Sequence, residues 1–268
     1  MLLTFPEMGF FVSKHCEEEV ENKRFMLHNH KNSYEIYIFL QGDAEFLVEG
    51  THYPLHPYDV ILAQSSEMHY IHHFCSCTYE RIVINLEHSF FAKNNCDAYK
   101  EIFINRPLGA NNCIPAKIVE QHGIPELLKR LETYLADKND GGVAAKSIII
   151  ELLYLLNRIG IKDEENTSHN GQIKDIILYL NEHLGESLSL EKVAEKFFIS
   201  KGHLCRSFKK NTGFTFNHYI TYKRLLLAKE LVEKGRSWIE ASEEAGFGNY
   251  SNFYKMYRRA YGHSPTKQ

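Results

Sequence analysis

The residues of this chain best suited to chemistry are three histidines and a glutamate in its N-terminal half. His28 and His30 are two positions apart, so on a strand their side chains share one face, and Glu35 and His69 follow along the chain. Three imidazoles and a carboxylate that converge would suit a divalent transition metal. The same groups could instead hydrogen-bond a small polar ligand, or satisfy polar groups inside the fold. We favour the ligand pocket and keep His28, His30, Glu35 and His69 as the alternative metal set.

The segments around these residues are predicted to be short strands. From Phe25 to Leu86 apolar and polar residues alternate, most clearly at 34–39, 45–48 and 81–84, with turns at 41–43 and 49–50. Strands this short and this closely spaced are typical of a sandwich or a small barrel. The alternation places Glu35 and Tyr37 on one face of their strand.

Two helices are predicted after the strands, at 117–136 and 143–159, separated by the Gly141-Gly142 pair. The second is apolar over a wider arc than one sheet face normally covers. It could pack on the first helix or on its own copy in a second subunit. We therefore expect a homodimer formed through these two helices.

The segment 162–171 is polar, charged and without periodicity, and it is the best domain boundary in the chain. It divides an N-terminal effector-binding and dimerisation domain, 1–162, from a C-terminal domain, 171–268. The overall charge of −3 conceals an asymmetry, because residues 171–268 hold 16 Lys and Arg against 10 Asp and Glu. A basic C-terminal half suits a polyanion such as DNA.

Composition and motifs narrow the class of protein further. The chain is 44% hydrophobic and 24% charged, as in ordinary globular proteins. It shows no CxxC pair, no basic n-region and no apolar run of membrane-spanning length. We expect a cytoplasmic protein with reduced thiols. A P-loop, a nucleophile elbow and an HExxH motif are all missing from the sequence, so we expect a binding protein and not an enzyme.

Two stretches of the C-terminal half, 188–213 and 237–262, repeat each other. With an offset of 49 positions, Leu204 meets Phe253 and Gly213 meets Gly262. Such a period indicates one supersecondary unit used twice, here a helix–turn–helix. The helix that joins the two, roughly 216–234, covers about 28 Å at ~1.5 Å per residue. This length is close to the ~34 Å of one turn of B-DNA. Helix N-caps are predicted at Ser189, Ser200, Thr215, Ser237 (with Glu240 in a capping box) and Asn249.

The third helix of each unit should face a DNA groove. Leu204 and Phe208 seat this helix in the first unit, as Phe253 and Tyr257 do in the second, so the remaining positions point outward. Polar side chains at the front of such a helix can reach base edges, and trailing cations can pair with phosphates. The predicted DNA-binding residues are Lys201, Gly202, His203, Cys205, Arg206, Lys209, Lys210, Tyr250, Ser251, Asn252, Lys255, Arg258 and Arg259.

The region 173–268 resembles the DNA-binding domain of the AraC/XylS family of bacterial transcriptional regulators. The resemblance is carried by residues 190–194, 200–210, Gly246-Phe247 and 262–265. It implies base contacts at Gly202, Cys205 and Arg206 in the first unit, and at Ser251, Asn252 and Lys255 in the second. It also implies double-stranded DNA as a partner, with RNA polymerase as a further candidate.

The N-terminal half resembles a cupin, because His28-x-His30-x4-Glu35-x6-Gly42 has the spacing of the first cupin motif and His69 falls where the second supplies a histidine. The fold class implied for the chain is α+β: a cupin-like β-barrel plus two helices, then an all-α domain. In regulators of this family such barrels resemble sugar or metabolite pockets without metal. Strand faces and the cupin alignment select as pocket candidates Arg24, His28, His30, Glu35, Tyr37, His69, Tyr79 and Arg81.

The sequence therefore predicts a ligand-responsive, sequence-specific transcriptional regulator, of carbohydrate or related metabolite genes, with no obligatory cofactor. The alternative is a metal-dependent cupin enzyme, such as a dioxygenase or isomerase, fused to a DNA-binding domain.

Overall fold

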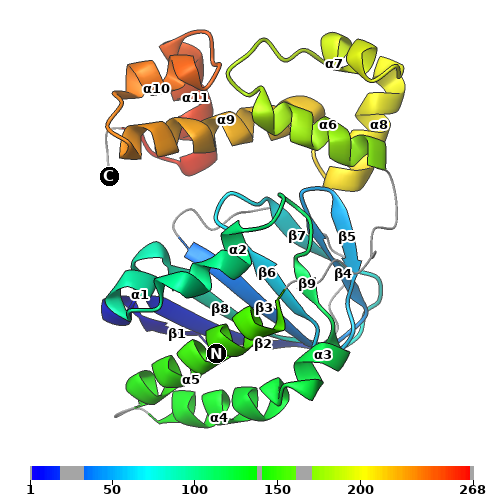
Figure 1. Cartoon of the computed structure of the whole chain (residues 1–268). Helices are drawn as coiled ribbons and strands as arrows, with labels where there is room; N and C mark the ends of the chain where they lie inside the picture. The colour runs from blue at the N-terminus through cyan, green and yellow to red at the C-terminus, as the bar shows by residue number, and fades with distance from the viewer. Residues whose placement is uncertain (1, 19–32, 138–140, 161–170, 266–268) are drawn as a thin grey trace. The chain divides into compact units, whose positions relative to one another are not determined.

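A computed structural model describes residues 2–18, 33–137, 141–160 and 171–265. The chain folds into two compact units, Met1–Ser168 and His169–Gln268, and each is described by itself (Figure 1). Arg24, His28, His30 and most of the 162–171 boundary segment lie outside the described residues.

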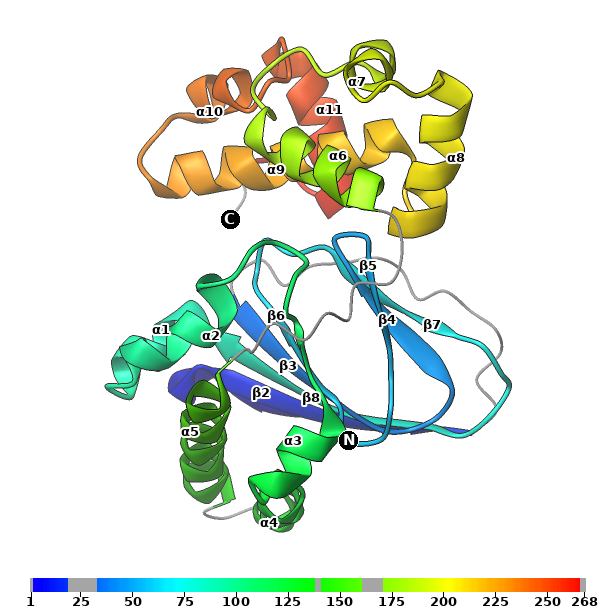
Figure 2. The same ribbon diagram turned by 45° about the vertical axis from the view of Figure 1, so that its right-hand side comes forward.

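The N-terminal unit is built on two antiparallel sheets. The larger has the strand order β1-β2-β8-β3-β6-β9, and the smaller has the order β5-β4-β7 (Figure 2). The strands of the larger sheet are β1 Leu2–Phe5, β2 Phe10–Glu17, β3 Ser33–Gln41, β6 Val60–Ala63, β8 Tyr79–Glu87 and β9 Cys113–Ile114. Those of the smaller are β4 Ala44–Val48, β5 Thr51–Pro54 and β7 His69–His73. The expected α+β fold class is confirmed, with the cupin-like part formed by these two sheets.

The strands begin earlier than the sequence indicated. The expected β region started at Phe25, whereas β1 and β2 precede it and pair with each other, for example Phe5 with Phe10. Strand β2 then pairs along its whole length with β8. Their residues do not alternate strictly, and Gly9, at φ +76°, forms the turn between them. Without strict alternation these strands leave little periodic signal in the sequence.

Alternation along β3 and β8 separates two cores. Ile36 and Ile84 point to the side covered by helices, and Tyr37 and Val83 point toward the smaller sheet. The predicted shared face of Glu35 and Tyr37 is confirmed, because both line the space between the sheets. The core between the two sheets is the smaller one. Polar residues such as Glu35 and Asn85 lie beside it and line a cavity.

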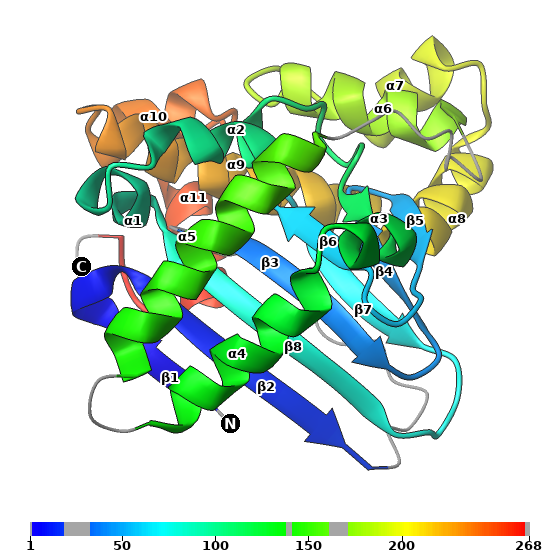
Figure 3. The same cartoon turned by 60° about the horizontal axis from the view of Figure 1, so that its bottom comes forward.

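Helices cover the outer face of the larger sheet (Figure 3). They are α1 His88–Lys93, α2 Glu101–Ile104, α3 Ala116–Gln121, α4 Ile124–Ala136 and α5 Gly141–Ile159, with short 3-10 turns at Pro6–Met8 and Asp97–Lys100. The single helix expected at 117–136 is wrong, because the chain breaks between α3 and α4. Gly123 takes a left-handed φ of +66° there, and Pro125 stands in the first turn of α4, where it needs no backbone donor.

Helix α5 divides its wide apolar arc between the core and the surface. Ile149, Leu152 and Leu156 are fully buried inside the same unit. Val143 and Tyr154 remain exposed, at 56% and 45%. The arc is therefore explained mainly by packing on the sheet and on α4, and only a narrow outer stripe is left for a second subunit.

Cys75 and Cys77 form a disulfide in the turn between β7 and β8, so the expectation that all thiols are reduced is wrong for this pair. Their Cα atoms lie 5.5 Å apart across this bend, a separation that a disulfide spans.

The C-terminal unit is entirely helical in its described residues. Its elements are α6 Gly171–Glu182, α7 Leu190–Lys196, α8 Lys201–Thr212, α9 Phe216–Glu233, α10 Trp238–Glu244 and α11 Tyr250–Tyr261. Helix α9 runs from the first helix–turn–helix, α7 with α8, to the second, α10 with α11 (Figure 1). The joining helix is thus as long as expected.

All the predicted N-caps are confirmed. Ser200 Oγ accepts from the His203 backbone N–H at 3.2 Å, and Asn249 Oδ1 accepts from Asn252 N–H at 2.8 Å. Ser237 and Glu240 form the full capping box. The repeat extends to the helix ends, because Gly213 and Gly262 close α8 and α11 with φ values of +77° and +75°.

Candidate effector cavity and DNA-reading helices

A cavity of about 220 Å³ opens between the two sheets of the N-terminal unit. Strands β2, β3, β4, β7 and β8 all contribute side chains to it. Its lining residues are Phe11, Ser13, His15, Glu35, Tyr37, Phe46, His69, Tyr70, Ile71, Arg81, Val83 and Asn85. Polar groups of both charges therefore face a space walled by aromatic rings.

Glu35 and His69, 34 positions apart in the sequence, meet at this cavity. Glu35 Oε1 lies 3.6 Å from His69 Nε2, and both side chains are buried. The other ring nitrogen, Nδ1, lies 3.0 Å from the Glu67 carbonyl, which fixes the ring orientation. The Phe46 ring stacks on the imidazole with 5.5 Å between centroids. His69 is thus held with Nε2 toward the carboxylate.

Tyr37, Tyr79 and Arg81 form a second cluster. The hydroxyls of Tyr37 and Tyr79 hydrogen-bond to each other, and the Arg81 guanidinium lies 4.9 Å from the centre of the Tyr79 ring. Burial raises the pKa of Tyr79 to about 12 and that of Tyr37 well above its usual value. Both phenols therefore stay protonated near neutral pH, where each can donate as well as accept a hydrogen bond.

Arg81 makes the surroundings of the cavity unfavourable to a further positive charge. Burial, followed by repulsion from Arg81, lowers the pKa of His73 to about 4. The same two causes, in the same order, lower the pKa of His15. His73 and His15 are accordingly mainly neutral at pH 7.

The structure brings four predicted pocket residues to the cavity: Glu35, Tyr37, His69 and Arg81. Tyr79 does not line it, and its buried ring packs against Arg81 and His73 instead. Arg24, His28 and His30 lie outside the described residues. Of the four proposed metal ligands only Glu35 and His69 can be placed, and the described residues contain no group of three potential ligands.

Sequence reasoning missed Ser13, His15 and Asn85. The first two belong to β2, which was not predicted as a strand. Asn85 could have been found, because it continues the alternation of Tyr79, Arg81 and Val83 along β8.

In the C-terminal unit, α8 and α11 present the predicted DNA-binding residues on their surfaces. All of them are exposed except Tyr250, which is half-buried. Leu204, Phe208, Phe253 and Tyr257 are buried, as predicted for the residues that seat these helices. The outward faces are therefore free of core packing.

Gly202 and Arg206 occupy successive turns of α8. A Cβ atom built on Gly202 would lie 3.3 Å from Arg206 Nη1, so the guanidinium extends forward over the glycine. The missing side chain at Gly202 gives the arginine room to reach the front of the helix, where the predicted base contacts lie.

Models of two domain families match the chain. An AraC-like ligand binding domain matches residues 15–153, and a helix-turn-helix domain matches residues 193–267. The chain belongs to the AraC family of transcriptional regulators and joins a ligand-binding domain to a DNA-binding one. Among the described residues, no helix is long and apolar enough to cross a membrane.

Several relatives are transcriptional regulators. The chain is 28% identical over 197 residues to the probable transcriptional regulator LumQ of Photobacterium leiognathi, covering 70% of this chain and 77% of LumQ. It is 28% identical to the transcriptional activator RhaS of Escherichia fergusonii, covering 56% of this chain and 55% of RhaS, about half of that relative's length.

Among solved structures, the C-terminal domain of AraT, a response regulator from Geobacillus stearothermophilus, is 28% identical with a TM-score of 0.36, covering 37% of this chain and 83% of that domain. ToxT from Vibrio cholerae is 13% identical with a TM-score of 0.39, covering 97% of both chains.

Proposed function

We propose that this regulator responds to a small hydroxylated metabolite, a carbohydrate or a related compound, bound in the N-terminal cavity. The observation that carries the proposal is Asn85, which lines the cavity and is 2% exposed. Its Oδ1 atom is buried and accepts no hydrogen bond from the described residues. A buried amide oxygen without a donor costs about 1–3 kcal/mol, which a ligand hydroxyl would offset.

The rest of the lining suits the same ligand class. Glu35 accepts hydrogen bonds, Arg81 donates them, and Tyr37 can do both, so the hydroxyls of a polyol can be paired in both directions. The rings of Phe46 and Tyr37 supply the apolar wall on which a sugar face packs. At about 220 Å³ the cavity is smaller than the ~300–1,000 Å³ of drug-sized sites, which limits the ligand to a small molecule.

We do not propose a metal in this cavity. The Arg81 guanidinium lines the same space as Glu35 and His69, and its charge opposes a divalent cation. The cavity's donor set favours neutral polar ligands, so a metabolite-binding regulator is preferred to a cupin enzyme.

The DNA-binding half is proposed to read two successive major-groove segments through α8 and α11, with a homodimer formed through the outer faces of α4 and α5. RNA polymerase is the further partner that transcriptional control would require. Control also requires that the ligand bind two arrangements of the protein with different affinity.

Calorimetric titration of the full chain with a panel of neutral monosaccharides tests the proposal. One of them should bind, and Asn85→Leu or Arg81→Gln should weaken it by roughly tenfold or more, as for loss of buried hydrogen bonds. Glu80→Gln is the matched control, because Glu80 lies on the opposite face of β8. The proposal is wrong if no neutral monosaccharide binds, or if neither cavity substitution changes the dissociation constant.

A further inference from the structure

We propose that the C-terminal unit carries a second ligand site, a cleft between α9 and α11 that binds a small organic anion. The cleft has a volume of about 460 Å³, twice that of the N-terminal cavity, and within the range of small-molecule sites. It is lined by Thr215, Asn217, His218, Thr221, Tyr222, Leu225, Met256, Arg259 and Ala260. All of these belong to α9, its N-cap or α11.

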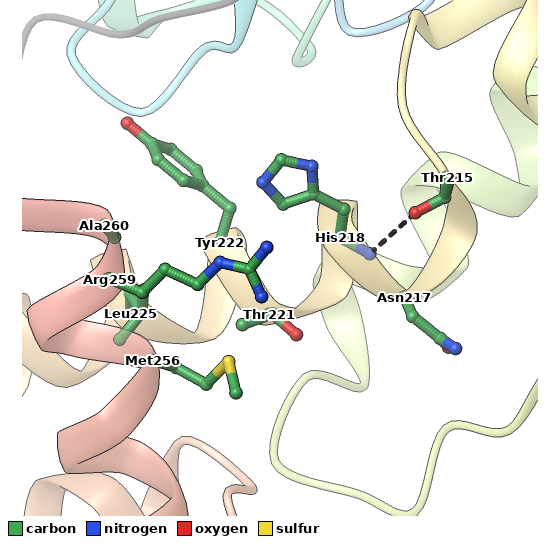
Figure 4. Close-up of a pocket in the computed structure, with 9 residues that line it drawn as sticks. All are labelled: Thr215, Asn217, His218, Thr221, Tyr222, Leu225, Met256, Arg259 and Ala260. Atoms are coloured by element: carbon green, nitrogen blue, oxygen red, sulfur yellow. Dashed lines mark hydrogen bonds between the residues drawn. The ribbon is translucent and has the colours of Figure 1, made fainter.

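The charge of the cleft is positive. Arg259 reaches from α11 toward α9, and its guanidinium lies over Thr221 on the side of His218 (Figure 4). No aspartate or glutamate lines the cleft, and no ion pair joins Arg259 to a carboxylate of the described residues. A guanidinium offers a planar pair of donors that matches a carboxylate or phosphate.

Neutral donors line the same cleft. Thr221 lies beside the Arg259 guanidinium, whereas the Tyr222 hydroxyl and the Asn217 amide point away from it (Figure 4). The His218 ring lies on the other side of the guanidinium from the Arg259 backbone (Figure 4). The backbone of His218 is already used, because its N–H donates to the Thr215 cap at 3.4 Å. The imidazole stands at the first turn of α9, with its ring 5.1 Å from that of Phe214, and at this end of the helix the dipole also favours an anion.

The apolar part of the cleft indicates that the ligand carries an apolar portion next to its anionic group. Leu225, Met256 and Ala260 form its base, and the Tyr222 ring forms one wall. A flexible thioether beside an aromatic ring accommodates flat apolar groups well. Inorganic phosphate alone would leave this surface uncovered, so the ligand is an organic carboxylate or phosphate monoester.

A ligand in this cleft would contact the last turn of α11, beyond the predicted base contacts along the helix axis, and Arg259 shares a helical face with Lys255. The predicted base contacts Ser251, Asn252 and Lys255 lie in the first two turns, whereas Arg259 and Ala260 lie in the last. A ligand that contacts both the end of α11 and the beginning of α9 would fix the orientation of α11 relative to α9. Helix α11 is the second predicted reading helix, and α9 joins the two helix–turn–helix units. Arg259, predicted as a phosphate contact, is here assigned to the ligand.

The test is calorimetric titration of the full chain with benzoate and with phenyl phosphate. Benzamide serves as the neutral counterpart of benzoate, and inorganic phosphate as the anionic group alone. At least one organic anion should bind more tightly than benzamide, by roughly tenfold or more, as expected for a charge-assisted pair. The tighter of the two distinguishes a carboxylate from a phosphate ester.

Arg259→Gln should abolish this preference, and Arg258→Gln is the control, since it removes the same charge one residue away without touching the cleft. Met256→Trp should fill the cleft and block binding; if it unfolds by circular dichroism, Arg259→Gln alone decides. Equal binding of benzamide, or no binding of any probe, overturns the proposal. So does binding that is lost in Arg81→Gln and retained in Arg259→Gln, which would place the probe in the N-terminal cavity. If Arg259→Gln weakens DNA binding and no probe binds the wild type, Arg259 is a DNA phosphate contact and not part of a ligand site.

Discussion

Arg106 and Glu67 form a bidentate ion pair inside the N-terminal unit, with Nη1–Oε1 at 2.7 Å and Nη2–Oε2 at 2.6 Å. Glu67 also accepts from Gly109 N–H at 2.8 Å and from Asn112 Nδ2 at 3.0 Å. These bonds fasten the segment before β9 to the turn that leads into β7. Because His69 begins β7, the pair also sets the position of one wall of the cavity.

Glu67→Gln should destabilise the N-terminal unit by about 3–5 kcal/mol, because it leaves the buried Arg106 without a counter-charge. Urea unfolding followed by circular dichroism measures the change. Asp97→Asn is the control, because the Asp97–Lys100 pair is at the surface. Its loss should lower the free energy of unfolding by no more than about 1 kcal/mol. Equal effects of the two substitutions would contradict this account of the buried pair.

Acidification should weaken the fold through His73. Its folded pKa of about 4 lies below the unfolded value of 6.5, so the unfolded chain binds more protons between these limits. The free energy of unfolding should therefore fall as pH drops from about 6.5 toward 4, by at most about 1.4 kcal/mol per pH unit from this group. His15, with its lowered pKa, acts in the same direction.

Urea unfolding at several pH values checks this, and His73→Gln should flatten the dependence. An unchanged slope in that variant would show that other groups are responsible.

Arg206→Ala should weaken specific operator binding by roughly 1–3 kcal/mol, as for loss of a bidentate base contact. Gly202→Ala should also weaken it, because the added Cβ would crowd the Arg206 guanidinium. Gel-shift titration at fixed salt, on operator and on unrelated DNA, separates the loss of specificity from loss of charge. A uniform loss on both DNAs would assign Arg206 to phosphate contact.

The dimer prediction now concerns the exposed stripe of α5. Val143 and Tyr154 lie three helical turns apart on one face, so Val143→Asp combined with Tyr154→Asp should give folded monomers. Light scattering measures the mass. Leu152→Asp is the contrasting variant, because it buries a charge in the core and should unfold the unit instead. A folded dimer in the double variant would place the interface elsewhere.

Elemental analysis of the purified full chain should find less than one equivalent of transition metal. The Arg81 charge in the cavity is the physical reason for this expectation. Stoichiometric metal, or turnover of a small substrate with added iron or manganese, would favour the cupin enzyme over the metabolite-binding regulator.

Local signals in the sequence were sufficient for the C-terminal unit. Its caps at Ser200 and Asn249, its buried Leu204 and Phe253, and its closing glycines are each determined by residues within one or two turns. Helices are built from contacts between near neighbours, so their bounds and faces can be read from periodicity and capping. The predicted reading faces rest on the same local logic.

The N-terminal cavity depended on contacts that no local pattern contains. Alternation predicted which side Glu35 faces, but the meeting of Glu35 with His69, and of Arg81 with Tyr37, follows from how β3, β7 and β8 are arranged in two sheets. The pairing of β2 with β8, which adds Ser13 and His15, joins segments about seventy residues apart. Strand pairing and register are set by non-local packing, and that is why only the tertiary structure decided which polar side chains share the cavity.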